Sequence, residues 1–336
     1  MDSFNLFERG TPELIQQVRE LGDESNENIG TLLLREGISS DHLFIVMNGA
    51  LGVTTQTAQD AKEQLSTLGQ GSLVGEMSWL EKRPPVASVE VHAPSTLLSI
   101  PHANLEKLLE QDCNFATQFY RLIAEKLALQ IKEQNTWVHR FSQQAETSEP
   151  LRKVLILFAG LDERDVHRLA GLGRRRMLSR GDILLRENDP VTALYIILSG
   201  EVDVTVSIDG NDHVIGSSRR GEVLGEMTFL LPEQNLASAT IQSRSGLDLL
   251  EIDASRFMQE LRSDHKFASR FYRSLACMLS QRSRDQLLSR QLAERSRLAE
   301  REVDQLNLDQ LEGATRAARH FDWLCRQVRS VQEFSQ

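Results

Sequence analysis

The chain has 336 residues, a length that predicts about two domains. Its 40% apolar and 26% charged residues suffice for packed cores and exclude global disorder. The formal net charge of −10 disfavours a general binder of nucleic acid or anionic membranes. No apolar run reaches the roughly 20 residues that span a bilayer, and the first ten residues lack the pattern of a signal peptide. Three scattered cysteines indicate neither a disulfide framework nor a zinc site. We therefore expect a cytoplasmic protein without a membrane span.

Two halves of the chain match block after block, at a spacing of 150 to 152 residues. The matching blocks are LLLRE at 32–36 and ILLRE at 183–187, FIVMNG at 44–49 and YIILSG at 195–200, VGEM at 74–77 and LGEM at 224–227, and FYR at 119–121 and 271–273. Four collinear matches predict a tandem duplication of one fold.

In chain order, each half begins with a short helix, expected over 12–21 and 162–172. Strands follow, most clearly at 200–208, where valine and isoleucine alternate with polar residues as in a half-buried antiparallel strand. Asp209-Gly210-Asn211 is typical of a hairpin tip. Several short strands with turn signals between them predict a barrel or jelly roll. Each half closes with a helix whose apolar stripe steps by three and four, at 115–127 and 267–279.

The segments outside the two repeats are a short linker and a long tail. Residues 141–150 are polar, end on a proline and are expected to link domains at 1–140 and 151–282. The tail, 283–336, has no proline and one glycine, which predicts a helix to about Leu311 and a second helix after it. The tail carries a short heptad seam, formed by Leu311, Ala314, Ala318, Phe321, Cys325 and Val328. Two interpretations stay open: the tail docks on the body, or it joins two copies.

The order of these blocks, Leu-x-Arg-Glu-Gly, Tyr/Phe-Ile-x-x-x-Gly and Gly-Glu-Met, resembles the cyclic-nucleotide-binding domain. That domain occurs in the catabolite activator protein, cyclic-nucleotide-gated channels and the protein kinase A regulatory subunit. The resemblance covers about residues 10–135 and 155–282. It implies an α+β, mainly β fold: two double-stranded β-helix (jelly-roll) domains with flanking helices and a helical tail. In that family Gly-Glu begins a short helix of the phosphate-binding cassette, the glutamate accepts from the ribose 2′-hydroxyl, and an arginine binds the phosphate.

Carried onto this sequence, the family pattern marks two candidate ligand pockets. The first pocket holds Gly75, Glu76, Ala87 and Ser88, and the second holds Gly225, Glu226, Ala239 and Thr240. The family's arginine lies two residues before the closing alanine, where this chain has Pro85 and Ala237. Arg83 is a candidate substitute in the first pocket, whereas the second cassette has no cation and is two residues longer.

The missing arginine decides which ligands we expect. An arginine fork makes two charge-assisted hydrogen bonds of about 1.5–3 kcal/mol each, so its loss weakens phosphate binding by one to several factors of ten. Glu76 and Glu226 then serve either as helix caps or as acceptors for a neutral ligand. No cofactor is certain, and the possible ligand is a cyclic nucleotide or a nucleoside.

The sequence lacks the residue patterns that the common catalytic and metal-binding motifs require. No metal-ligand spacing, P-loop, G-x-S-x-G or G-x-G-x-x-G string occurs, so neither an enzyme nor a metal site is expected. The run Arg174-Arg175-Arg176 is short and is expected at a solvated edge. Trp79 and Phe229 follow the two Gly-Glu-Met segments at equal spacing and are expected to be core residues. The tail has neither a winged-helix pattern nor excess Lys and Arg, so DNA binding is not expected.

The leading hypothesis is a non-enzymatic regulatory or adaptor protein with tandem, degenerate cyclic-nucleotide-binding-like domains. It would act through protein–protein contacts, with a protein partner or by self-association through the C-terminal helices. The alternative is a small-molecule sensor that binds a cyclic nucleotide or nucleoside through Glu76 and Glu226 to control a partner. A transcription regulator is disfavoured by the absence of a DNA-reading element.

Overall fold

The computed structural model describes residues 4–56, 62–138, 156–208, 211–231, 235–292 and 308–333. The chain divides into two compact units. The first unit is Met1–Ile131 with Leu279–Gln305, and the second is Lys132–Met278 with Leu306–Gln336. Each unit therefore combines one repeat with a segment from later in the chain. The expected linker at 141–150 lies outside the described residues, and the domain boundaries drawn from the sequence stay predictions.

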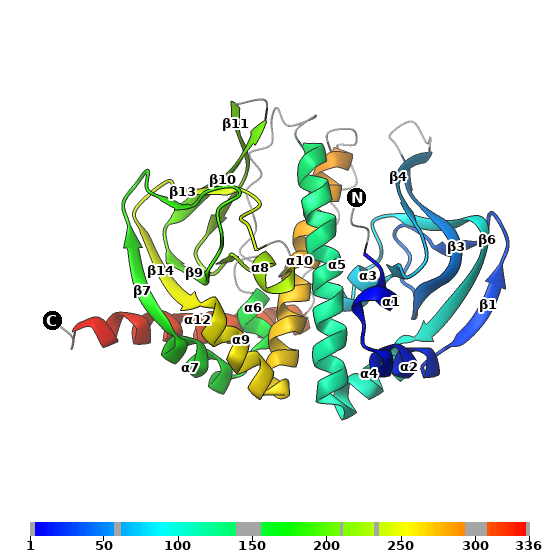
Figure 1. Ribbon diagram of the computed structural model, residues 1–336, viewed down its shortest axis with the longest axis horizontal. Coiled ribbons are helices and arrows are strands. Elements are labelled where there is room, and N and C mark those ends of the chain that lie inside the picture. The colour runs from blue at the N-terminus through cyan, green and yellow to red at the C-terminus, as the bar shows by residue number, and fades with distance from the viewer. Residues whose placement is uncertain are drawn as a thin grey trace. The chain divides into compact units, whose positions relative to one another are not determined.

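The first unit is an antiparallel β-roll with flanking helices (Figure 1). Its strands form one sheet in the order β1-β6-β3-β4, with β2 paired to β6 and β5 paired to β3. The strands are β1 (Asp23–Glu27), β2 (Leu32–Leu34), β3 (His42–Gln56), β4 (Lys62–Leu68), β5 (Leu73–Val74) and β6 (Ser88–Pro101). The helices are α1 (Leu6–Arg9), α2 (Pro12–Glu20), α3 (Glu76–Glu81), α4 (His102–Gln111) and α5 (Cys113–Val138), which belongs to this unit as far as Ile131.

The second unit repeats the roll as two four-stranded sheets, β11-β10-β13-β8 and β12-β9-β14-β7 (Figure 1). Its strands are β7 (Gly173–Leu178), β8 (Ile183–Leu185), β9 (Ala193–Ser199), β10 (Glu201–Ile208), β11 (Asn211–Arg219), β12 (Val223–Leu224), β13 (Thr240–Ser243) and β14 (Leu247–Asp253). Its helices are α6 (Ile156–Gly160), α7 (Glu163–Leu172), α8 (Met227–Leu230), α9 (Ala254–Ser263), α12 (Leu308–Glu333) and the first half of α10 (His265–Leu292). The tandem jelly-roll fold class is thus confirmed.

One glycine turns the same strand in both copies. Gly49 has a φ of 102°, and the β3–β6 register shifts around it. A Cβ there would come within 2.2 Å of the Ser95 Oγ. The matching Gly200 has a φ of 98°, and a Cβ on it would lie 2.4 Å from the Gly246 carbonyl oxygen. Only glycine fits such a bend, so the expected strand at 200–208 begins at Glu201.

The helices and strands expected within the two repeats are present, whereas the second tail helix begins at Leu308 and not after Leu311. Val202 and Val206 of β10 are buried, and Ile208 pairs with Asn211 of β11. The tip residues Asp209 and Gly210 lie outside the described residues. Helices α2 and α7 match the expected opening helices. The apolar stripes of the closing helices α5 and α10 are buried, apart from Lys126, which bonds a carboxylate.

The three-arginine run lies on β7 and is matched by acids on the neighbouring strand β14. Arg174 lies 2.7 Å from Glu251, and Arg175 donates to both oxygens of Asp248 at 2.7 and 2.9 Å. These cross-strand pairs offset the positive charge. The arrangement agrees with a solvated edge of the roll and gives no support to a nucleic-acid patch.

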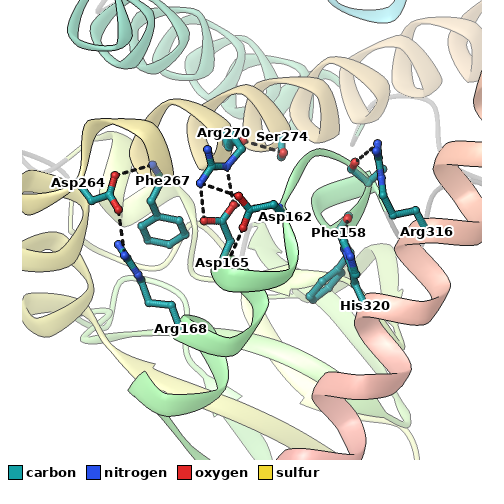
Figure 2. Close-up of polar contacts among 11 residues, drawn as sticks. Phe158, Asp162, Asp165, Arg168, Asp264, Phe267, Arg270, Ser274, Arg316 and His320 are labelled. Atoms are coloured by element: carbon teal, nitrogen blue, oxygen red, sulfur yellow. Dashed lines mark hydrogen bonds and ion pairs between the residues drawn. The ribbon is translucent and has the colours of Figure 1, made fainter.

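Helix α12 docks along the second unit. The buried face of α12 consists of Ala317, Phe321, Leu324, Cys325 and Val328. The Phe321 ring lies 5.1 Å from the ring of Phe158 in α6. Arg316 and His320 contact the carbonyl oxygens of Ala159 and Phe158 (Figure 2). The docked interpretation of the tail is therefore confirmed for its second helix, and residues 293–307 lie outside the described residues.

A charged clamp joins the opening and closing helices of the second unit (Figure 2). Arg270 of α10 donates to both carboxylate oxygens of Asp165 at 2.6 and 2.8 Å and lies 3.1 Å from Asp162, the N-cap of α7. Arg168 of α7 donates to Asp264 at 2.9 Å. Asp165 is 1% exposed, so this clamp includes a buried charge.

In the first unit the equivalent positions are joined by hydrogen bonds without an ion pair. At the positions equivalent to Asp162 and Arg270, Thr11 donates to Gln118 at 3.0 Å. Gln17 stands at the position equivalent to Arg168 and Asp112 at that equivalent to Asp264, and Gln17 donates to Asp112 at 3.3 Å. The two copies thus hold the same helix pair with interactions of different strength, since hydrogen bonds between charged groups are about twice as strong.

The clamp predicts unequal effects of matched substitutions. We expect Arg270→Met to lower the free energy of unfolding of the second unit by about 1–3 kcal/mol, because buried Asp165 loses its cation. Gln118→Met should cost about 0.5–1.5 kcal/mol in the first unit. Hydrogen exchange of α7 and α2 in urea measures each unit separately. An equal or larger loss for Gln118→Met would contradict the prediction.

The docked tail predicts that one aromatic residue holds α12. Phe321→Ala removes a 2% exposed ring and should loosen α12 by about 3–5 kcal/mol. Faster amide exchange across 308–333 would show the release. Exposed Arg326→Ala on the same helix is the control and should leave exchange unchanged. Equal exchange in the Phe321→Ala protein and the wild type would show that this face does not hold the helix.

Candidate functional site

The first candidate pocket places Gly75 and Glu76 where the resemblance expects them, at the start of α3. Gly75 has a φ of 93° and is the N-cap of the helix. Glu76 is 3% exposed, and its Oε1 accepts from the Nζ of Lys126 at 2.5 Å. Lys126 also donates to the Leu73 carbonyl oxygen at 2.6 Å. One oxygen of the carboxylate expected to accept from a ligand hydroxyl therefore already accepts from an ammonium group of α5.

The hydroxyl residues that close the two cassettes have the same role in both copies. Ser88 Oγ accepts from the backbone N–H of Glu36 at 3.0 Å, and Thr240 Oγ1 accepts from that of Glu187 at 3.0 Å. Their neighbours Ala87 and Ala239 are half-buried and buried, respectively. The structure thus brings Ser88 and Thr240 to the Leu-x-Arg-Glu loop of each repeat.

The residues that stand in place of the family's arginine, Pro85 and Ala237, make the same backbone hydrogen bond in both copies. The Pro85 carbonyl oxygen accepts from Gly37 at 2.9 Å, and that of Ala237 accepts from Asn188 at 2.8 Å. Gly37 and Asn188 both have positive φ, 76° and 67°. The backbone frame of the cassette is retained in each repeat although the side chain that binds phosphate in the family is absent.

Arg83, the candidate substitute cation, follows α3 and contacts the end of that helix. Its Nη1 lies 4.0 Å from Glu81, and its backbone N–H donates to the Ser78 carbonyl oxygen. Its side chain is one-quarter exposed. A role for Arg83 toward a phosphate stays a prediction.

The second cassette is built around apolar residues. Gly225 has a φ of 80°, and a Cβ there would lie 2.7 Å from the Ala193 carbonyl oxygen. Glu226 is buried at the start of α8, and Ala237 fills the arginine position at 7% exposure. Phe229 packs edge-on against Phe257 at 5.6 Å between ring centroids, which confirms it as a core residue.

Trp79 takes the corresponding core position in the first unit. It is 4% exposed and stacks on Tyr120 of α5, with 5.9 Å between ring centroids. It meets Phe119 edge-on at 6.3 Å. The aromatic residues that follow both Gly-Glu-Met segments thus join each cassette helix to a closing helix or its neighbour.

Sequence reasoning missed a buried ion pair at the end of the first cassette. Glu81 of α3 lies 2.5 Å from the Nε of Arg284, and their side chains are 1% and 2% exposed. Arg284 Nη1 also donates to the Pro84 carbonyl oxygen at 3.0 Å, and Ser280 donates to Glu81 at 2.5 Å. Burial raises the pKa of the Glu81 carboxyl, while the Arg284 charge opposes that rise. About 200 residues separate the partners, so no local pattern could have paired them.

The second unit also has an open groove of about 580 Å³ along residues 178–195. Asp182, Arg186, Asp189 and Tyr195 are among its lining residues. None of the second-pocket residues expected from the resemblance lines this groove. Within the described ranges, no group of three or more metal-ligating side chains gathers, and no helix has the length and apolar character needed to cross a bilayer.

Known proteins similar to this chain include kinase regulatory proteins. A "cAMP-dependent protein kinase regulatory subunit" from Blastocladiella emersonii is 20% identical over 69% of this chain and 50% of its own length. A "cGMP-dependent protein kinase egl-4" from Caenorhabditis briggsae is 25% identical over 70% of this chain and 27% of its own length. The chain thus spans about half or less of the length of these two relatives.

A solved structure, the regulatory domain of Toxoplasma gondii PKA with cAMP, is 18% identical with a TM-score of 0.31. It covers 84% of this chain and 93% of its own. The family model for the cyclic nucleotide-binding domain matches residues 28–112 and 175–264, more than half of the chain. This chain therefore belongs to the family of cyclic nucleotide-binding domain proteins, with two copies of that domain.

Proposed function

We propose that this protein is a non-enzymatic regulatory or adaptor protein whose cyclic nucleotide-binding domains act through protein–protein contacts. The observation that carries the proposal is the Glu76–Lys126 pair. A buried carboxylate that already accepts at 2.5 Å from the Lys126 ammonium group, whose side chain is 11% exposed, has a hydrogen-bond partner and a countercharge without a ligand. The first cassette then serves as a structural joint between α3 and α5.

The charges in both cassettes disfavour tight binding of a cyclic phosphate. A phosphate placed there would meet a buried glutamate and, at Pro85 or Ala237, no guanidinium group. Burying an anion without a cation is costly. Lys126 does not replace the arginine, because its ammonium group already bonds Glu76 and the Leu73 carbonyl oxygen.

The partner we propose is a protein, by analogy with the kinase regulatory subunits that this chain resembles. Of the predicted seam, Phe321, Cys325 and Val328 are buried within the second unit, whereas Ala314 is exposed and Ala318 is half-buried. A second copy could therefore pair with that seam only after α12 had undocked. We accordingly favour a partner other than a second copy and place the protein in the cytoplasm, without a role in DNA binding.

The alternative is a sensor for a neutral ligand such as a nucleoside. It is supported by the cassette backbone, which keeps the same glycine turn and the same hydroxyl contact in both copies. Such a ligand needs no arginine. In the first pocket it would have to displace Lys126 from Glu76.

Thermal unfolding with added ligand distinguishes the two proposals. We expect cyclic AMP, cyclic GMP, adenosine and guanosine, each at millimolar concentration, to leave the unfolding temperature unchanged. Ligand binding at 100 times its Kd would add about 2.7 kcal/mol, a readily measured shift. Saturable stabilisation that disappears in Glu76→Gln or Glu226→Gln would instead establish the sensor and overturn the adaptor proposal.

The structural role of Glu76 is tested by removing its cation. Lys126→Met leaves a buried carboxylate alone and should lower the free energy of unfolding of the first unit by about 3–5 kcal/mol. Glu76→Gln/Lys126→Met removes both charges and should recover a large part of the loss. Urea unfolding followed by hydrogen exchange of α3 and α5 gives both values. A negligible effect of Lys126→Met would show that Glu76 is not held by this pair.

A further inference from the structure

The second unit has a surface that docks a helix, and α12 occupies it. The Phe321 ring of α12 lies 5.1 Å from the ring of Phe158, which is fully buried. Two side chains of α12 contact the backbone carbonyl oxygens of Phe158 and Ala159 (Figure 2). The Trp323 ring lies 3.8 Å from the ring of His167 in α7. Helices α6 and α7 and the adjoining edge of β7 and β14 thus form a helix-docking surface.

The first unit has the equivalent surface, formed by α1, α2 and β1. Phe7 lies four residues before Thr11, the N-cap of α2, as Phe158 lies four residues before Asp162, the N-cap of α7. Phe7 is only half-buried, and the exposed guanidinium group of Arg19 lies 5.8 Å from its ring centre. The ring that α12 covers in the second unit therefore stays partly open in the first.

The strand beside this surface carries opposite charge in the two units. Glu24 of β1 is paired through β6 with Ile45, and Arg175 of β7 is paired through β14 with the equivalent Ile196. Arg175 faces the helix-docking surface, because the Asp248 carboxylate that it bonds also lies 3.4 Å from an arginine of α12. Glu24 thus places a negative charge where the second unit has a positive one.

The helix-docking surface of the first unit carries four glutamates. Glu13 and Glu20 lie three and four residues from Gln16, which corresponds to His167, so they share the face of α2 that matches the α12-binding face of α7. The four glutamates are Glu8, Glu13, Glu20 and Glu24, and the second unit has Ala159, Arg164, Gly171 and Arg175 at these positions. All four are exposed, and none forms an ion pair with another described residue. No part of the chain that the structure describes therefore covers this face.

The tail of this chain does not supply a helix of matching charge. Residues 308–333 contain four arginines and four acidic residues, and residues 293–307 contain three arginines and four acidic residues. A helix that binds four glutamates needs an excess of Lys and Arg, because complementary charge directs both specificity and the rate of association. The occupant that fits this surface is therefore a helix from another protein.

From this comparison we propose that α1, α2 and β1 of the first unit bind a basic amphipathic helix of a partner protein, as the second unit binds α12. An apolar or aromatic residue of that helix packs on Phe7, and Lys or Arg residues beside it face the four glutamates. The inference rests on the proposed function, because it names the surface through which this protein contacts its partner.

A synthetic peptide on the full chain tests the proposal. The probe is residues 308–333 with four substitutions, Asp309→Lys, Glu312→Lys, Asp322→Lys and Glu333→Lys. Since Asp322 pairs with Arg220 in the second unit, the change at 322 also disfavours binding of the probe there. We expect the peptide to bind at 0.15 M salt and to slow amide exchange across 6–27, with exchange across 308–333 unchanged. No binding, or faster exchange across 308–333 through displacement of α12, would overturn the proposal.

Matched charge reversals show whether the peptide uses this face. Glu20→Lys/Glu24→Lys should weaken binding by about tenfold or more, because two attractions become repulsions. Asp23→Lys/Glu27→Lys makes the same change of charge on the opposite face of β1 and should alter the affinity by less than about twofold. Equal losses in the two variants would show attraction to the acidic unit as a whole and refute a docking surface on this face.

Two further peptides separate this inference from its alternatives. A scrambled form of the basic peptide and the unmodified 308–333 sequence should each bind about tenfold more weakly or less. Equal binding of the scrambled form would show that no amphipathic helix is recognised. Equal binding of the unmodified sequence would make α12 of a second copy the occupant. Either result overturns the inference and leaves the adaptor proposal standing, since the ligand experiments test that proposal separately.

Discussion

The first unit depends on one constraint: two carboxylates of its cassette helix are buried and must each have a cation. Glu76 at the start of α3 bonds Lys126, and Glu81 at its end bonds Arg284. The two cations come from different helices, α5 and α10. A six-residue helix with one buried carboxylate near each end is therefore fixed by elements distant in sequence, and this requirement explains why the closing helices lie against the cassette.

The two copies satisfy the same architecture with different chemistry. Backbone features are shared, such as the glycine bend at 49 and 200 and the positive φ at 37 and 188. Side-chain interactions diverge: the helix clamp consists of hydrogen bonds without an ion pair in the first unit and of ion pairs in the second. Among the described residues, the tail helix α12 packs on the second unit, and the tail residues of α10 from 283 belong to the first. The backbone of the fold thus accommodates different side-chain charges in the two copies.

The sequence was sufficient to predict the fold, because its main signals are local or repeated. Block matches revealed the duplication, alternation in β10 revealed a strand, and helical spacing revealed α5 and α10. Site chemistry was predicted less well. Lys126 was seen as a member of an apolar stripe, since periodicity shows which face a residue occupies and not which atom it bonds. Arg284 could not be identified as a partner of Glu81, because a pair formed across about 200 residues leaves no trace in spacing.

The division of α10 between the two units has a practical meaning for fragments of this protein. Residues up to 278 of α10 belong to the second unit, and those from 279 belong to the first. A fragment that ends at 140, as the sequence boundaries suggest, would contain Glu81 but not Arg284. Its cassette would hold Glu81 without its natural cation and without the helix segment that contacts it, so ligand binding by the fragment would describe an altered pocket. A fragment that keeps the native contacts of the first repeat must also include the segment of α10 from residue 279, which follows the second repeat in the chain.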